Sequence, residues 1–244
     1  MLTSLQNAKV KEWKKLHKRK YRNQSAQFLV EGFHMVEEVL KSSWEVKELI
    51  IREGTEFPLP EGIPYTLVSP QVFTAIAETE TPQGIAAVVG KENRGFEPKA
   101  LTLMIDAVQD PGNVGTLIRT ADAAGFDQVI LGTGSVDAYN DKVLRATQGS
   151  IFHIPIFAGD LEEYIQPLKE AGTEIWASTL EDAHPFQQLQ PTGKSAIIVG
   201  NEGQGIQQHI VRQADKQVYI PIYGQAESLN VAIAGAVLMY HLKS

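Results

Sequence analysis

IDAVQDPGNVGTLIRTADAAGFDQVIL, residues 105–131, decides the fold class of this chain. The stretch runs from an apolar strand predicted over 101–108 into a helix predicted over 114–124, and then into a strand over 128–131. The same alternation of short Val- and Ile-rich strands with helices continues to residue 242. It predicts an α/β domain whose mostly parallel sheet is covered by helices on both faces.

The other predicted elements are short and bounded by turn residues. In the second half, helices are expected over 139–148, 161–171, 206–214 and 228–242, and strands over 151–157, 174–178, 195–199 and 218–222. In the first half, helices are expected over 4–20, 33–41 and 69–77, and strands over 27–31, 46–51, 65–68 and 84–89. The helix at 228–242 is apolar almost all round, which indicates burial within the core, in a dimer interface, or in both.

A polar stretch separates the two halves of the chain. GKENRGFEPKA, residues 90–100, contains two glycines and a proline and has no hydrophobic periodicity. We therefore predict a smaller α/β domain over residues 1–92, a linker over 93–100 and a second α/β domain over residues 101–244.

The composition excludes several classes of site. The chain has no cysteine, which rules out a disulfide framework, a thiolate zinc site and a cysteine nucleophile. The six histidines are scattered without metal-ligand spacing, so no metal is expected. Because the N-terminus does not resemble a signal peptide and the longest apolar run is too short to span a bilayer, we expect a cytoplasmic protein without a membrane partner.

Charge is distributed unevenly along the chain. The formal net charge is −7, yet residues 1–22 hold eight basic residues against the single acid Glu12. This asymmetry indicates a partner with a phosphate backbone, although a solvated lysine-rich helix has the same composition. The candidate contacts to such a partner are Lys14, Lys15, Lys18, Arg19 and Arg22.

Three loops that follow predicted strands carry polar residues, and ligands of open parallel sheets bind at the carboxyl ends of the strands. In the first loop, Asn113 is a candidate helix N-cap, and Arg119 follows it as a candidate partner for a carboxylate or phosphate. A cap followed by a surface arginine is the alternative. The second loop is Gly200–Gly205, whose glycines allow close approach of a ligand or simply form a turn.

The third loop joins the predicted strand at 218–222 to the apolar helix at 228–242. Ser228 is a candidate cap for that helix, and Asn230 lies in its first turn, where its amide could reach back to the loop.

Together these loops resemble the three sequence motifs of the SpoU/TrmH family of RNA 2′-O-methyltransferases. The matching stretches are residues 105–131, IIVGNEGQGI at 197–206 and YIPIYGQAESLNVAIAGAVLMY at 219–240, in the family's order. Each motif is weak alone, but the ordered set, with N-x-G-x-x-x-R, G-N-E-G and S-L-N-V intact, is highly specific.

The resemblance implies a SPOUT-type α/β domain whose C-terminal segment is threaded into a trefoil knot. It also implies a homodimer that holds S-adenosylmethionine in the knotted loops near the interface. By family likeness, backbone groups at Gly200, Ile220 and Leu229 hold the adenine end of this cofactor, and Asn201 and Gly203 belong to the same binding loops.

Residues 5–90 more loosely resemble the L30e-like substrate-binding domain of several ribosomal RNA members, which favours ribosomal RNA over transfer RNA.

The hypothesis for the reaction is that Arg119 stabilises the alkoxide that develops from the ribose 2′-hydroxyl, because arginine is a poor general base. Asn113 would fix the ribose or Arg119, and Glu202 would orient Arg119. Ser228 and Asn230 would shape the loop at the reacting centre.

Three other interpretations of the sequence stay open at this point. The chain could methylate transfer RNA, or it could be a non-catalytic RNA-binding protein of the same fold. A nucleotide-dependent oxidoreductase is the third, but the glycine pattern after residue 199 differs from the dinucleotide fingerprint in order and position.

Overall fold

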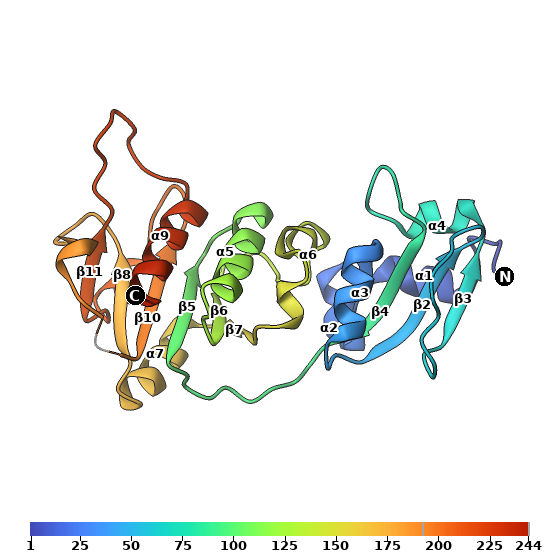
Figure 1. Cartoon of the computed structure of the whole chain (residues 1–244), viewed down its shortest axis with the longest axis horizontal. Helices are drawn as coiled ribbons and strands as arrows, with labels where there is room; N and C mark the ends of the chain where they lie inside the picture. The colour runs from blue at the N-terminus through green and yellow to red at the C-terminus, as the bar shows by residue number, and fades with distance from the viewer. Residues whose placement is uncertain (192, 244) are drawn as a thin grey trace. The chain divides into compact units, whose positions relative to one another are not determined.

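The computed structural model describes residues 1–191 and 193–243, which form two compact units (Figure 1). The N-terminal unit comprises Met1–Arg94 together with Tyr139–Phe152, and the C-terminal unit comprises Gly95–Ala138 together with His153–Ser244. The predicted second domain, 101–244, therefore differs from the C-terminal unit in two places: residues 95–100 belong to this unit, and Tyr139–Phe152 belongs to the N-terminal unit.

A four-stranded sheet with the order β1-β4-β2-β3 forms the centre of the N-terminal unit. Its strands are β1 (Gln27–Glu31), β2 (Val46–Arg52), β3 (Tyr65–Val68) and β4 (Ile85–Gly90). β4 pairs antiparallel with both β1 and β2, whereas β3 runs parallel to β2. All six residues of β4 are buried, as expected for the central strand of a sheet that is covered on both faces.

Helices cover this sheet through their apolar stripes. α1 (Ala8–Lys15) and α4 (Pro70–Ile76) share one buried cluster that includes Trp13 and Phe73. Ser69 caps α4 as predicted, because its Oγ accepts a hydrogen bond from the amide of Val72. α3 (Phe33–Lys41) packs against β1 and β4.

The helix predicted over residues 4–20 is wrong, because the chain breaks into α1 and a second helix, α2 (Arg19–Ser25). The guanidinium of Arg22 donates hydrogen bonds to the carbonyls of Leu16 and His17, at 2.9 and 2.8 Å. These bonds supply partners for the backbone carbonyls where α1 ends. Arg22 is only 3% exposed. Its predicted contact with a phosphate backbone is therefore replaced by a structural role.

The segment Tyr139–Phe152 packs on the rest of the N-terminal unit through aromatic rings. The ring centre of Tyr139 lies 4.7 Å from that of Phe28, and the ring centre of Phe152 lies 5.7 Å from that of Trp44. This segment contains α6 (Asp141–Thr147), shorter than the helix predicted over 139–148, and the 3-10 helix η1 (Ser150–Phe152). The strand predicted over 151–157 is therefore wrong in its first half, and β7 comprises only Ile156–Gly159.

The C-terminal unit contains a seven-stranded sheet with the order β7-β6-β5-β10-β8-β11-β9. All of its described pairings are parallel, which confirms the predicted parallel α/β sheet. Besides β7, its strands are β5 (Leu101–Asp106), β6 (Gln128–Gly132), β8 (Glu174–Ser178), β9 (His184–Pro185), β10 (Ser195–Gly200) and β11 (Lys216–Tyr219). Sequence periodicity does not predict β9, because two residues are too short to show a period.

Helices cover both faces of this sheet. α5 (Pro111–Ala123) and α9 (Val231–Lys243) pack against each other on one face (Figure 1). They approach closely at Gly235, where a Cβ would overlap the side chain of Leu117 and touch that of Val199. α7 (Leu161–Glu170) and α8 (Gln208–Val211) share a buried cluster with strand residues such as Met104. The short 3-10 helix η2 (Phe186–Gln188) follows β9.

The two faces of α9 differ in exposure. Val231, Leu238 and Met239 are buried, in agreement with the prediction of a core helix. On the opposite face, Ile233 is 53% exposed, Val237 36% and Tyr240 56%. We call these three residues the α9 stripe; their spacing of four and three residues places them along one line of the helix.

Within residues 1–191 and 193–243, no helix has both the length and the apolar character that a membrane span requires.

Candidate functional site

The loops that follow β5, β8, β10 and β11 leave the sheet at one edge, because these strands are parallel neighbours in the order β5-β10-β8-β11. Figure 1 shows the long connection from β11 to α9 leaving the sheet at this edge. The three sequence motifs are thus brought to the position where parallel sheets bind ligands.

A chain of hydrogen bonds joins the three motifs. The Nδ2 of Asn230 donates to the Oδ1 of Asn113 at 2.9 Å, and the Nδ2 of Asn113 donates to the Oε1 of Glu202 at 2.8 Å. The three residues come from the β11–α9 loop, α5 and the loop after β10. We call this the Asn230–Asn113–Glu202 chain; it shows that the three predicted residues meet in space.

Two predicted helix caps are wrong. Asp110, not Asn113, caps α5, because its Oδ1 accepts from the amide of Asn113 at 2.7 Å. Asn230, not Ser228, precedes α9, and its Oδ1 accepts from the amide of Ala232 at 2.9 Å. The side chain of Asn113 is consequently available to join its neighbours across the site.

Asn201 organises the loop after β10. Its Oδ1 accepts from the amides of Gly203 and Gln204, at 2.9 and 3.1 Å, and its Nδ2 donates to the carbonyl of Ala107 at 2.9 Å. At the start of this loop, a Cβ on Gly200 would overlap the backbone of Gly205 and Ile206. Gly200 is therefore required for the tight turn that closes the loop.

A buried carboxylate that the sequence analysis missed holds the far end of the same loop. Asp106 is 1% exposed and accepts from the backbone amide and the Nε2 of Gln207, both at 2.7 Å. An acid at the end of the apolar strand LTLMID was the available signal, because a buried carboxylate needs partners.

A cavity of about 150 Å³ opens at the carboxyl ends of β8 and β11. It is lined by three predicted residues, Ile220, Ser228 and Leu229, and by residues that the sequence analysis missed, among them Thr179 and Leu180 after β8. Position alone could have indicated the missed pair, since they follow a parallel strand at the same edge as the motifs. Gly200, Asn201 and Gly203 do not line this cavity.

Two backbone amides at this cavity have no acceptor in the described part of the protein. Within residues 1–191 and 193–243, no group accepts a hydrogen bond from the amides of Ile220 or Leu229. Backbone amides of fixed geometry can donate hydrogen bonds to the polar edge of an aromatic heterocycle, while apolar side chains beside them contact its face.

Arg119 does not join the Asn230–Asn113–Glu202 chain. It is exposed on α5 and makes no hydrogen bond or ion pair with the described part of the protein. Six residues advance an α-helix by about 600°, so Arg119 points roughly 120° away from Asn113. The expectation that Glu202 orients Arg119 is therefore wrong within one chain, because Glu202 contacts Asn113 instead.

The basic residues predicted to contact phosphates lie in the N-terminal unit. Lys14, Lys15, Lys18 and Arg19 are all exposed. The ammonium of Lys15 lies 5.6 Å from the ring centre of Tyr21. Among the described residues, no group of three or more potential metal ligands occurs.

Two family models match the chain. The SpoU rRNA Methylase family matches residues 100–240, and an MRM3-like substrate binding domain matches residues 7–87. A relative from Bacillus subtilis (strain 168), the 23S rRNA (guanosine(2553)-2′-O)-methyltransferase RlmP, is 48% identical over 99% of this chain and 98% of its own length.

Solved structures of RNA-modifying enzymes are also similar to this chain. The AdoMet-bound rRNA methyltransferase from Sinorhizobium meliloti superposes with a TM-score of 0.89 at 29% identity, covering 99% of this chain and 96% of that protein. The A. aeolicus TrmH/SpoU tRNA modifying enzyme has a TM-score of 0.52 at 29% identity and covers 59% of this chain and 74% of its own. The chain is thus similar over its whole length to a ribosomal RNA enzyme, and to this transfer RNA enzyme over part of it.

We predict that Gly200→Ala destabilises the C-terminal unit, because the new Cβ must displace backbone atoms of Gly205 and Ile206. The expected loss of unfolding free energy is about 1–3 kcal/mol, measured by thermal or denaturant unfolding. Gly203→Ala is the matched control, since only the Oδ1 of Asn201, at 3.7 Å, lies near its added Cβ. Equal stability of the two variants would contradict the assigned role of Gly200.

Proposed function

Because the chain belongs to the SpoU rRNA methylase family, we propose that it methylates the ribose 2′-hydroxyl of a guanosine in 23S ribosomal RNA. The chain is an S-adenosylmethionine-dependent RNA 2′-O-methyltransferase with the α/β fold of SPOUT enzymes and a small N-terminal substrate-binding domain. The observation that carries the proposal is the Asn230–Asn113–Glu202 chain, which joins the family's three motifs at the ligand-binding edge of the sheet.

The residues at this edge fit S-adenosylmethionine. The apolar side chains of Leu180, Ile220 and Leu229 line a cavity suited to the flat adenine ring. The backbone amides of Ile220 and Leu229 would donate hydrogen bonds to the polar edge of this ring, and the loop Gly200–Gly203 would form one boundary of the site. When bound, this cofactor supplies an electrophilic methyl group on a sulfonium.

The protein's task in the reaction is to align the ribose hydroxyl and to stabilise negative charge on its oxygen. Arg119 would provide the stabilising charge, because a guanidinium stays protonated and cannot act efficiently as a base. Asn113 would position the ribose. Glu202, Asn230 and Ser228 would act as positioning residues, since Glu202 and Asn230 fix both sides of the Asn113 amide.

The protein is proposed to act as a homodimer through the α9 stripe. Ile233, Val237 and Tyr240 form an exposed apolar row, which is typical of a surface that another protein covers. Arg119 lies on α5, which packs against α9, so a second copy bound there could also cover Arg119 and fix its guanidinium.

The trefoil knot is a further part of the proposal. After β11, at the far side of β8 from β10, the chain returns so that α9 packs on β10 and α5. Such a return path is what threading through the loop after β10 would require. An experimental chain trace in which α9 can be withdrawn without crossing that loop would exclude the knot.

The whole-length similarity to a ribosomal RNA enzyme favours this substrate over transfer RNA, and it favours a cytoplasmic location, where the ribosome is.

We further propose that residues 93–100 link an RNA-binding domain over 1–92 to a methyltransferase domain over 101–244. The exposed residues Lys14, Lys15, Lys18 and Arg19 would attract the phosphates.

We predict that Arg119→Ala lowers kcat for methylation of 23S ribosomal RNA by about 100-fold or more, by analogy with the loss of an oxyanion donor. The measurement is transfer of a labelled methyl group, with cofactor affinity followed by calorimetry and expected to be unchanged. Arg212→Ala removes another exposed arginine and should retain full activity. Normal turnover by the Arg119 variant would exclude the role in charge stabilisation.

Replacement of Lys14, Lys15, Lys18 and Arg19 by glutamine should weaken RNA binding and flatten its salt dependence. Each lost phosphate contact is expected to reduce the slope of log K against log salt by about 0.7–0.9. The control replaces four exposed lysines elsewhere, namely Lys41, Lys99, Lys142 and Lys194. Identical slopes for the two variants would show that the basic segment is only a solvated surface.

Val237→Glu should convert a dimer into a monomer, because it places a charge at the centre of the α9 stripe. Light scattering after size exclusion measures the mass. Leu59→Glu makes the same kind of change at another exposed leucine, in the N-terminal unit, and should leave the dimer intact. A monomeric wild type, or a dimeric Val237 variant, would refute this interface.

A further inference from the structure

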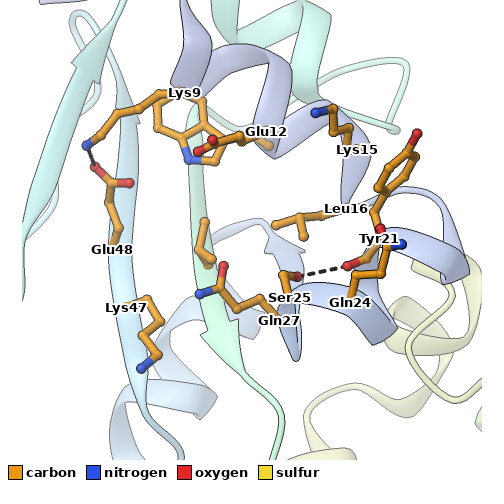
Figure 2. A pocket seen from close by; sticks show the side chains of 12 residues that line it. Lys9, Glu12, Lys15, Leu16, Tyr21, Gln24, Ser25, Gln27, Lys47 and Glu48 are labelled. Carbon is orange, nitrogen blue, oxygen red and sulfur yellow. Dashed lines mark hydrogen bonds and ion pairs between the residues drawn. The ribbon is translucent and has the colours of Figure 1, made fainter.

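The N-terminal unit contains a cavity of about 400 Å³ that the reaction does not use. It lies between α1, α2 and strands β1, β2 and β4 of the sheet (Figure 2). Its apolar wall is formed by Trp13, Leu16 and Val88, which are buried. The wall and the volume suit a flat aromatic group of the size of a nucleobase.

The polar rim of this cavity has unused hydrogen-bonding groups. Figure 2 shows Glu12 of α1 on one side of the cavity and Gln27 of β1 on the other. Among the described residues, the side chains of Glu12, Gln24 and Gln27 have no hydrogen-bond or ion-pair partner. Two of the lysines are by contrast engaged, since Lys9 pairs with Glu48 at 2.6 Å and Lys47 pairs with a glutamate outside the cavity.

Glu12 is a negative charge within a strongly basic segment. It is the single acid among residues 1–22, which hold eight basic residues. On a surface that attracts phosphates, a carboxylate weakens binding by repulsion unless it makes hydrogen bonds that offset the repulsion. An ionised carboxylate only accepts hydrogen bonds, so its partner must present donors.

Guanine matches this arrangement. Its N1–H and exocyclic N2–H₂ are adjacent donors that a carboxylate can accept together, and the amides of Gln24 and Gln27 can donate to its oxygen. Uracil presents only one ring N–H, flanked by carbonyl oxygens. Proteins read RNA sequence mainly from unpaired bases, which can leave the stack and enter such a cavity.

We propose that this cavity binds an unpaired guanine of the substrate RNA, at a nucleotide other than the one that is methylated. The inference rests on the proposed RNA substrate and adds a base-specific contact to the general attraction of the basic segment. Glu12 accepts from the Watson–Crick edge of the base, the base packs over Trp13 and Leu16, and Lys15 lies at the rim for a flanking phosphate.

The test compares RNA hairpins that differ only in one nucleotide: a bulged guanosine, a bulged uridine, or no bulge. Fluorescence anisotropy gives the affinity of the full-length protein for each. The wild type should bind the guanosine bulge most tightly. Glu12→Gln should weaken that complex by about tenfold, because an amide can no longer accept both N–H groups, as for a lost bidentate base contact.

The sign of the effect separates base recognition from bulk charge. For the fully paired hairpin, Glu12→Gln should bind as well as the wild type or more tightly, because it removes a negative charge. Glu37→Gln is the matched control, since Glu37 is an exposed acid on α3 outside the cavity. It should change the affinity for all three hairpins equally.

The proposal is overturned if Glu12→Gln binds the guanosine-bulged hairpin as tightly as the wild type, or if the wild type does not distinguish the hairpins. Methyl transfer to 23S ribosomal RNA by the wild type is measured in parallel. Transfer without guanine preference defeats only the cavity proposal, whereas absence of transfer defeats the proposed substrate.

Discussion

The site depends on one directional chain of hydrogen bonds, from Asn230 through Asn113 to Glu202. A side-chain amide donates on one side and accepts on the other, whereas a carboxylate only accepts, so the chain must end on the acid. The order of residue types therefore fixes the direction of each amide. Because the three residues come from α5 and from two separate loops, the same two bonds fix the positions of both loops relative to α5. Loss of either amide would leave polar groups without partners at the point where the three motifs meet.

The rest of the C-terminal unit supports this chain by anchoring the loop that carries Glu202. Asn201 fastens the beginning of the loop to Ala107, and the buried carboxylate of Asp106 fastens its end through Gln207. Both anchors lie at the end of β5, the direct neighbour of β10. The parallel pairing of these strands thus holds Glu202 near the start of α5, where Asn113 is located. A buried acid that is satisfied by two hydrogen bonds is a rigid support, since each unmet bond would cost about 1–3 kcal/mol.

Periodicity predicted the parallel sheet and most helices, because burial on both faces produces continuous apolar strands. It failed where a partner distant in sequence decides the outcome. Asn113 and Ser228 have the residue types of helix caps, but Asp110 and Asn230 fill these positions, and no local signal shows that the Asn113 amide is needed elsewhere. Residues 4–20 contain a helical pattern without a visible break, yet the buried guanidinium of Arg22 binds the carbonyls of Leu16 and His17 and ends the first helix. The ordered set of three motifs predicted that these three segments meet, whereas no single residue type predicted it.

Arg119 raises a separate question about where its charge can act. A guanidinium in bulk water interacts weakly with a nearby oxyanion, because the solvent has a dielectric constant of about 80 and reorganises around both charges. The same pair interacts several times more strongly once water is excluded.

In a single chain Arg119 is exposed and has no partner among the described residues, so the C-terminal unit alone does not provide that environment. Under the proposed role of Arg119, a bound partner would have to exclude water from its guanidinium. In the proposed dimer, a second copy on the apolar, exposed α9 stripe would cover one side of Arg119, and the RNA would cover the other. Under this proposal, assembly and substrate binding would both be conditions for catalysis, and Arg119 would gain its contacts only in the assembled complex.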